Sequence, residues 1–171
     1  MMITAAIFLI LPLCLAFAAF NDLFTMTIPN RISVILIGSF LVIAPFTGMG
    51  WQVFGMSLLA AALVFVCGFA LFALNTMGGG DAKLLTATAL WFGFSGELAM
   101  YMVAVAIVGG LLTMLILFVR SYHQQILASG LPIPDSLLVA KKVPYGIAIA
   151  IAGLMTYPEA PIVQAAMRSI L

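Results

Sequence analysis

The chain has 171 residues, of which 65% are hydrophobic and only 6% are charged, and its mean hydropathy is +1.31. Soluble domains carry about 25% charged residues, so this composition excludes a soluble enzyme and indicates a polytopic membrane protein. The net charge of +1 gives no reason to expect a nucleic-acid partner. Cys14 and Cys67 lie in apolar runs without metal-ligand spacing, which favours two buried thiols over a zinc site or a disulfide.

The apolar runs predict an all-α fold with six transmembrane helices in a single membrane-embedded domain, residues 1–171. The runs cover residues 3–20, 32–46, 52–74, 83–94, 97–119 and 143–157. A cleaved signal peptide is the alternative for the first run, but the run lacks a basic start and is longer than a typical signal core. Counted from Ala82 to Ser95, the fourth segment predicts about 21 Å of helix, which is too short to cross about 30 Å of hydrocarbon. Either the bilayer thins there, or this helix begins in a water-accessible recess.

The connections between the runs predict the topology. Residues 120–142 form the longest polar connection, which we expect to lie along the membrane surface. Pro158 and Pro161 break the last run and leave residues 162–171 as a short interfacial tail. The basic residues gather on one side of the predicted membrane: Arg31, Lys83, Arg120, Lys141 and Lys142. Only Arg168 falls on the other side, so the positive-inside rule makes the first side cytoplasmic and places both chain ends away from the cytoplasm.

Two acids fall on this cytoplasmic side, Asp22 where the first run ends and Asp81 where the fourth begins. Acids near membrane depth are costly and are candidates for function. Two carboxyls that lie close together resist ionising together, so one keeps a proton. Such a pair can activate a water and protonate a leaving group. The alternative for each acid alone is a helix cap or an ion pair with Lys83, but the pair favours catalysis.

Asp81 belongs to a glycine motif, residues 78–85, which reads Gly-Gly-Gly-Asp-Ala-Lys-Leu-Leu. The glycines permit a tight turn and close backbone approach, and the acid falls in the first turn of the next helix, where the helix dipole favours it. Asp22 is followed six residues later by Ile28-Pro29-Asn30, and we call these residues the first motif. Residues 143–146, Val-Pro-Tyr-Gly, form a third motif.

These three motifs, in this order, resemble those of the prepilin peptidases, which are membrane-embedded GxGD aspartic proteases. The resemblance extends over essentially the whole chain and is closest to the short members that process Flp/Tad-type pilins. It implies an aspartic endopeptidase with Asp22 and Asp81 as the catalytic pair. The residues expected to shape the active site are Gly78, Gly80, Lys83, Pro29, Asn30, Pro144, Tyr145 and Gly146. Lys83 has two open roles, an ion-pair partner or a contact to lipid phosphate.

The resemblance also implies a location and a substrate. The protein is expected in the bacterial inner membrane, with its active site facing the cytoplasm and needing neither a cofactor nor a metal. Its substrate would be a type IV prepilin or pseudopilin precursor, whose short basic leader is removed, usually after a glycine. The N-terminal region that long members use for N-methylation is not expected here, so methyl transfer is unsupported.

Other residues and functions give weaker hypotheses. A small proton- or ion-coupled transporter would also place two acids among six spans, but it leaves the first and third motifs unexplained. A structural membrane subunit leaves the paired acids unexplained. The remaining polar candidates read as loop, turn or helix-end residues: His123, Asp135, Glu97 and Glu159. The many methionines indicate packing rather than a metal site.

Overall fold

The computed structural model describes residues 2–122 and 143–168, and the regular structure within these ranges is all helical. The elements in chain order are α1 (Met2–Thr25), α2 (Asn30–Ile43), the 3₁₀ helix η1 (Ala44–Thr47), α3 (Trp51–Ala73), α4 (Gly79–Phe92), α5 (Gly96–Ser121), α8 (Tyr145–Thr156), the 3₁₀ helix η2 (Tyr157–Glu159) and α9 (Pro161–Arg168). Among the described residues, five helical segments are long and apolar enough to cross a membrane. With its 14 residues, α4 is the short fourth helix. The predicted all-α membrane fold is therefore confirmed.

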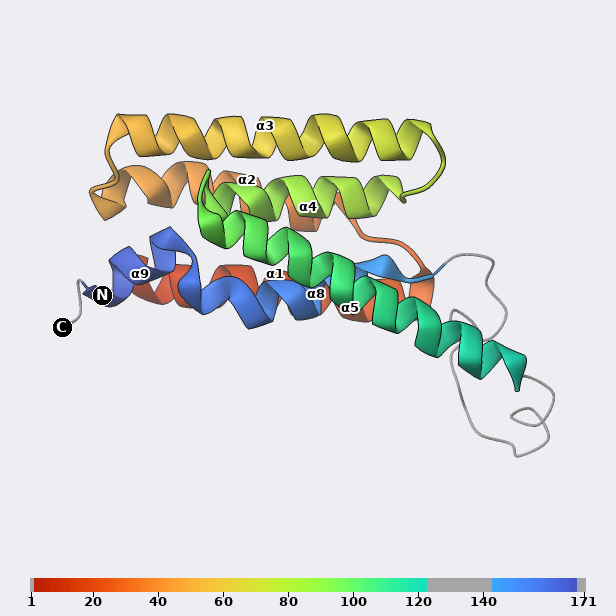
Figure 1. Ribbon diagram of the computed structural model, residues 1–171. Helices are drawn as coiled ribbons and strands as arrows, with labels where there is room; N and C mark the ends of the chain where they lie inside the picture. The colour runs from red at the N-terminus through yellow and green to blue at the C-terminus, as the bar shows by residue number, and fades with distance from the viewer. Residues whose placement is uncertain (1, 123–142, 169–171) are drawn as a thin grey trace.

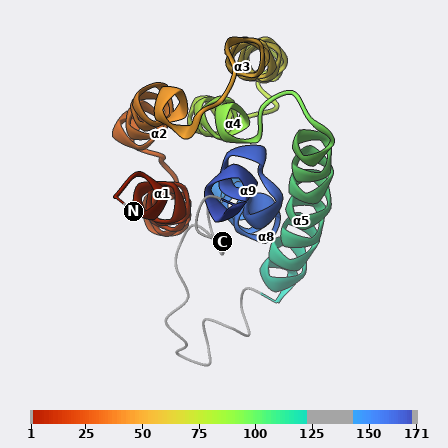
Figure 2. The ribbon, with the colours of Figure 1, turned by 90° about the vertical axis from the view of Figure 1, so that its left-hand side faces the viewer.

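Two helices, α4 and α8, occupy the middle of the bundle, and α1, α2, α3 and α5 surround them (Figure 2). On one side α4 packs against α3 and α2, and on the other α8 packs between α1 and α5. The approach of α3 to α4 depends on Gly68, where an added Cβ would lie 3.2 Å from the Cβ of Ala82. Large apolar side chains cover the outer faces, for example Leu13, Phe17 and Leu111. This distribution suits a bundle surrounded by lipid.

Helix boundaries follow local sequence signals. Pro29 and Pro144 stand just before α2 and α8, where a proline's missing N–H costs nothing. The hydroxyl of Ser95 accepts a hydrogen bond of 3.3 Å from the N–H of Leu98 and caps the start of α5. Gly93 ends α4 with a φ of +64°, a conformation that favours glycine. These signals set where each helix enters and leaves the bundle.

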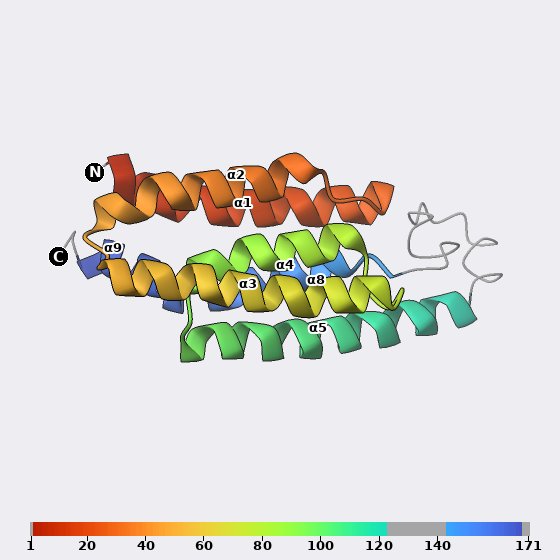
Figure 3. The same ribbon diagram turned by 90° about the horizontal axis from the view of Figure 1, so that it is seen from above.

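The helix ends alternate between the two ends of the bundle, as Figures 1 and 3 show. One end gathers the C-termini of α1, α3 and α5 with the N-termini of α2, α4 and α8. By their places in these helices, Arg31, Lys83 and Arg120 belong to that end, whereas Arg168 ends α9 at the other. The arrangement agrees with the predicted separation of basic residues. Lys141 and Lys142 lie outside the described residues.

The first helix is longer than predicted. The apolar run stops at Phe20, but α1 continues to Thr25, so Asp22 lies inside a helix rather than in a polar connection. The polar side chains there bond back to the helix. Asn21 Nδ2 donates to the carbonyl of Phe17 at 2.9 Å, and Thr25 Oγ1 donates to that of Asn21 at 2.8 Å. In this way the polar side chains of the last turns are accommodated within the helix.

The C-terminal segment also packs more closely than expected. Pro158 and Pro161 do interrupt the last span, since η2 separates α8 from α9. However, α9 turns its Ile162 and Val163 side chains fully into the protein and packs against α1, α4 and η1. The apolar face of α9 therefore covers the end of the bundle at which α4 terminates. Residues 169–171 of the predicted tail lie outside the described residues.

Candidate active site

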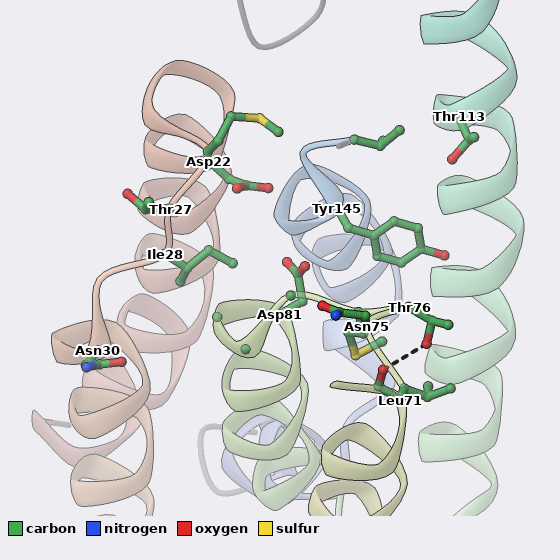
Figure 4. A pocket seen from close by; sticks show the side chains of 16 residues that line it. Asp22, Thr27, Ile28, Asn30, Leu71, Asn75, Thr76, Asp81, Thr113 and Tyr145 are labelled. Carbon is green, nitrogen blue, oxygen red and sulfur yellow. Dashed lines mark hydrogen bonds between the residues drawn. The ribbon is translucent and has the colours of Figure 1, made fainter. Parts of the chain in front are cut away.

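A cavity of about 790 Å³ opens at the end of the bundle that collects the basic residues (Figure 4). Its walls come from the last turn of α1 and the α1–α2 connection, from residues 75–81, from α3 and α5, and from the start of α8. All three sequence motifs contribute residues to it. The cavity therefore joins parts of the chain that are more than a hundred residues apart.

Asp22 and Asp81 both line this cavity. Asp22 projects from the last turns of α1, and Asp81 from the first turn of α4. In Figure 4 the two carboxyl groups point into the same space, between the side chain of Ile28 on one side and the ring of Tyr145 on the other. Asp22 is buried, with 5% of its surface exposed, and Asp81 is half-buried. The structure thus brings the two candidate catalytic acids together at one end of the helical bundle.

The third motif contacts Asp22 directly. The backbone N–H of Gly146 donates a 2.7 Å hydrogen bond to Oδ2 of Asp22. Gly146 lies in the first turn of α8, where N–H groups have no partner within the helix and the dipole favours a negative charge. A Cβ on Gly146 would lie 2.8 Å from both Asp22 Oδ2 and Ile28 Cδ1. Glycine is therefore required here by close approach.

The glycine motif forms the start of α4. Gly78 is the N-cap residue and Asp81 falls in the first helical turn, as the sequence predicts. A Cβ on Gly78 would lie 2.7 Å from Asp81 Oδ2, and one on Gly80 would lie 3.1 Å from the Cβ of Ile28. The glycines thus allow α4 to begin against the first motif, with the carboxyl of Asp81 folded back over the helix start.

The glycines were expected to permit both a tight turn and close backbone approach, and for Gly80 the expectation of a turn is wrong. Gly80 is helical, so its role is close contact with Ile28 and not an unusual backbone angle. Among the residues that line the cavity, positive φ angles belong instead to Met26, with a φ of 54°, and Asn75, with a φ of 60°. Helix α4 begins at Gly79 rather than at Lys83 because two of the glycines join its first turn.

A family profile for type IV leader peptidases matches residues 9–119, which is more than half of the chain. The chain belongs to the type IV leader peptidase family. It is therefore an aspartic-type endopeptidase, a conclusion that favours the enzyme over the transporter considered from the sequence. The match contains the first motif and the glycine motif and ends before the third. No curated protein and no solved structure matches the chain.

Lys83 of this peptidase links two of the motifs. Its Nζ donates a 3.0 Å hydrogen bond to Oδ1 of Asn30, the first residue of α2. The bond ties α4, two residues after Asp81, to the start of α2, and Asn30 itself lines the cavity. Pro29 precedes Asn30 and directs the chain into α2. Lys83 and Pro29 therefore act on the arrangement of the helix ends that carry the cavity.

Several residues that line the peptidase cavity lie outside the three motifs, among them Thr113 of α5 and Asn75. The hydroxyl of Thr113 donates a 2.7 Å hydrogen bond to the carbonyl of Gly109. Thr113 is the one polar side chain between residues 102 and 119 of the sequence. A lone hydroxyl in an apolar span was a usable signal, because such groups favour the protein interior.

The other candidates lie away from the cavity or outside the described residues. Glu97 and Glu159 fall at the start of α5 and in η2, toward the opposite end of the bundle. His123 and Asp135 belong to the segment that the structure does not describe. Within residues 2–122 and 143–168, no group of three or more His, Cys, Asp or Glu side chains gathers as metal ligands would.

Proposed function

We propose that this peptidase removes the leader of type IV prepilin-like precursors by means of a water activated between Asp22 and Asp81. The observation that carries the proposal is the placement of both carboxyls in one cavity, from motifs at the ends of α1 and α4. Ionisable side chains at membrane depth cost free energy and are rare, so those that are present indicate a functional site. The Gly146 hydrogen bond and the glycine contacts around Asp81 support the same reading, because they hold each acid in position.

The chemistry needs one ionised and one protonated carboxyl. The ionised carboxylate takes a proton from water as the water oxygen attacks the carbonyl carbon of the scissile peptide. The protonated carboxyl gives its proton to the carbonyl oxygen, so that a neutral tetrahedral intermediate forms. The first carboxyl, now protonated, gives its proton to the peptide nitrogen, while the second, now ionised, takes a proton from a hydroxyl of the intermediate. The carbon–nitrogen bond then breaks, which yields the leader's carboxyl end and the new amino terminus of the pilin and restores both carboxyls.

The substrate class follows from the family and from charge. Precursors with a short basic leader followed by an apolar helix would place the cleavage point near the membrane boundary. Arg31, Lys83 and Arg120 belong to the cavity end, so the positive-inside rule supports a cytoplasmic active site in an inner membrane. The motifs are most similar to those of short Flp/Tad-type peptidases, so we expect leader cleavage without N-methylation.

A reconstituted cleavage assay tests the proposal. The purified protein in liposomes is mixed with a type IV prepilin carrying its leader, and the product is identified by mass spectrometry. We expect one cut at the junction of leader and apolar helix, with no mass gain from methylation. Cleavage that persists in the double variant Asp22→Asn/Asp81→Asn would refute the two-aspartate mechanism. Cleavage at many unrelated sites would refute the substrate class.

A further inference from the structure

Helix α5 carries two adjacent glycines that lie in different surroundings. Gly109 is buried and faces α8, whereas Gly110 is exposed and an added Cβ there would meet no atom within 4 Å. Small residues in membrane helices often allow neighbouring helices to approach closely. The difference between the two positions shows that only Gly109 accommodates a neighbour.

The neighbour at Gly109 is the ring of Tyr145, the first residue of α8. An added Cβ on Gly109 would collide with the hydroxyl oxygen, Cζ and Cε2 of that ring. Even Cε2, the farthest of the three, would lie only 2.7 Å away. Carbon atoms in good contact are about 3.5–4.0 Å apart. The ring therefore occupies space that exists because residue 109 has no side chain.

The other side of the ring faces the cavity. Tyr145 lines the cavity, and in Figure 4 its ring stands beside the carboxyl of Asp81. Thr113, one helical turn beyond Gly109, lines the same wall and bonds to the Gly109 carbonyl. A ring pushed off α5 would move toward Asp81, into the space where a substrate peptide must meet the two carboxyls.

We propose that Gly109 is a positioning residue for catalysis: it seats the Tyr145 ring against α5 and keeps the space between Asp22 and Asp81 open. This inference rests on the proposed function, since it assumes that this space receives the scissile peptide. It assigns a role to a residue outside the three motifs. It also explains why an aromatic side chain can stand beside the acids without filling the site.

The test compares two alanine substitutions on the same helix, Gly109→Ala and Gly110→Ala, in the reconstituted cleavage assay. Both substitutions make the same change in helix propensity. A difference in activity between them therefore reflects the contact of residue 109 with the Tyr145 ring and not the stability of the helix. We expect Gly109→Ala to lower kcat/KM on the order of 100-fold, the scale of an ångström-sized misplacement in an active site. Gly110→Ala should stay within about twofold of the wild type, because its Cβ meets open space.

A second experiment, in a Tyr145 variant, distinguishes a specific clash with the ring from a general loss of folding or stability. Tyr145→Ala removes the hydroxyl, Cζ and Cε2, the three atoms that the added Cβ would meet, so we expect Gly109→Ala to cost at least several-fold less relative to the Tyr145→Ala parent than relative to the wild type. If Gly109→Ala fails to accumulate in membranes, the Tyr145→Ala background should restore its level. A Gly109→Ala enzyme as active as Gly110→Ala would overturn the inference, and so would a loss that Tyr145→Ala leaves unchanged. Absence of cleavage by the wild type would count against the proposed function instead.

Discussion

The N–H of Gly146 and the Oδ2 of Asp22 are joined by a 2.7 Å hydrogen bond across 124 positions of sequence. This contact attaches the third motif to the acid of the first, although the family match ends at residue 119. The first turn of α8 thereby forms part of the wall of the cavity that holds both acids. The backbone of Asp22 belongs to α1, and its carboxylate is held by the N-terminal turn of α8.

Gly146→Ala should therefore abolish most of the activity while both acids remain. The new Cβ would lie 2.8 Å from Asp22 Oδ2 and 2.8 Å from Ile28 Cδ1, so either α8 or the carboxyl must shift. We expect a loss of kcat/KM on the order of 100-fold in the cleavage assay. Gly38→Ala in α2, where an added Cβ meets nothing within 4 Å, is the matched control and should cleave normally. Normal cleavage by Gly146→Ala would show that this contact does not position Asp22.

Asp22→Asn and Asp81→Asn should each reduce cleavage to background while the protein remains inserted and folded. Asparagine keeps the shape of aspartate, but it can neither accept nor donate the proton that the reaction moves. The measurement is leader cleavage by equal amounts of membrane-inserted protein. Glu97→Gln, at the start of α5, serves as the control and should keep wild-type activity. Substantial cleavage by either asparagine variant would require a different general base.

Gly80→Val should stop leader cleavage through its contact with Ile28. A Cβ at residue 80 lies 3.1 Å from the Cβ of Ile28, and valine adds two methyl groups that are stiff at χ1. The first turn of α4, and Asp81 with it, must then move away from the first motif. Gly80→Ala should have a milder effect, and Ile28→Gly should relieve the Gly80→Ala defect, because it removes both the Cβ and the Cγ1 that the new side chain would meet. No relief would mean that Gly80 acts through another contact.

The placement of the acids and the short fourth helix were predictable because charge is scarce in this chain. An apolar sequence leaves few positions where Asp22 and Asp81 can lie, and both fall beside turns at the same predicted membrane face. The position of Asp81 in the first turn of α4 follows from the helix dipole, but the start of the helix at Gly79 was not predicted, because the apolar run begins only at Lys83.

The contacts between motifs were not predictable, because they depend on the separation of helices. The sequence shows two glycines at 109 and 110, but only packing against Tyr145 distinguishes them. It also suggests a bent backbone at Gly80, whereas the left-handed angles fall on Met26 and Asn75. The extension of α1 past its apolar run includes polar side chains that bond to carbonyls one turn earlier, which hydropathy does not register.

The role of Lys83 can be decided by a double-mutant cycle with Asn30. Their 3.0 Å hydrogen bond ties the start of α4 to the start of α2, and Asp81 lies two residues before Lys83 in α4. Both side chains are exposed, so we expect Lys83→Met and Asn30→Leu each to lower kcat/KM several-fold without abolishing cleavage. If the bond is the cause, the double variant should be no worse than either single variant. Lys83→Arg, which can still donate, should keep most of the activity.

A contact between Lys83 and lipid phosphate predicts a different result. The losses caused by Lys83→Met and Asn30→Leu would then multiply, and the Lys83→Met defect would change with the anionic lipid content of the liposomes.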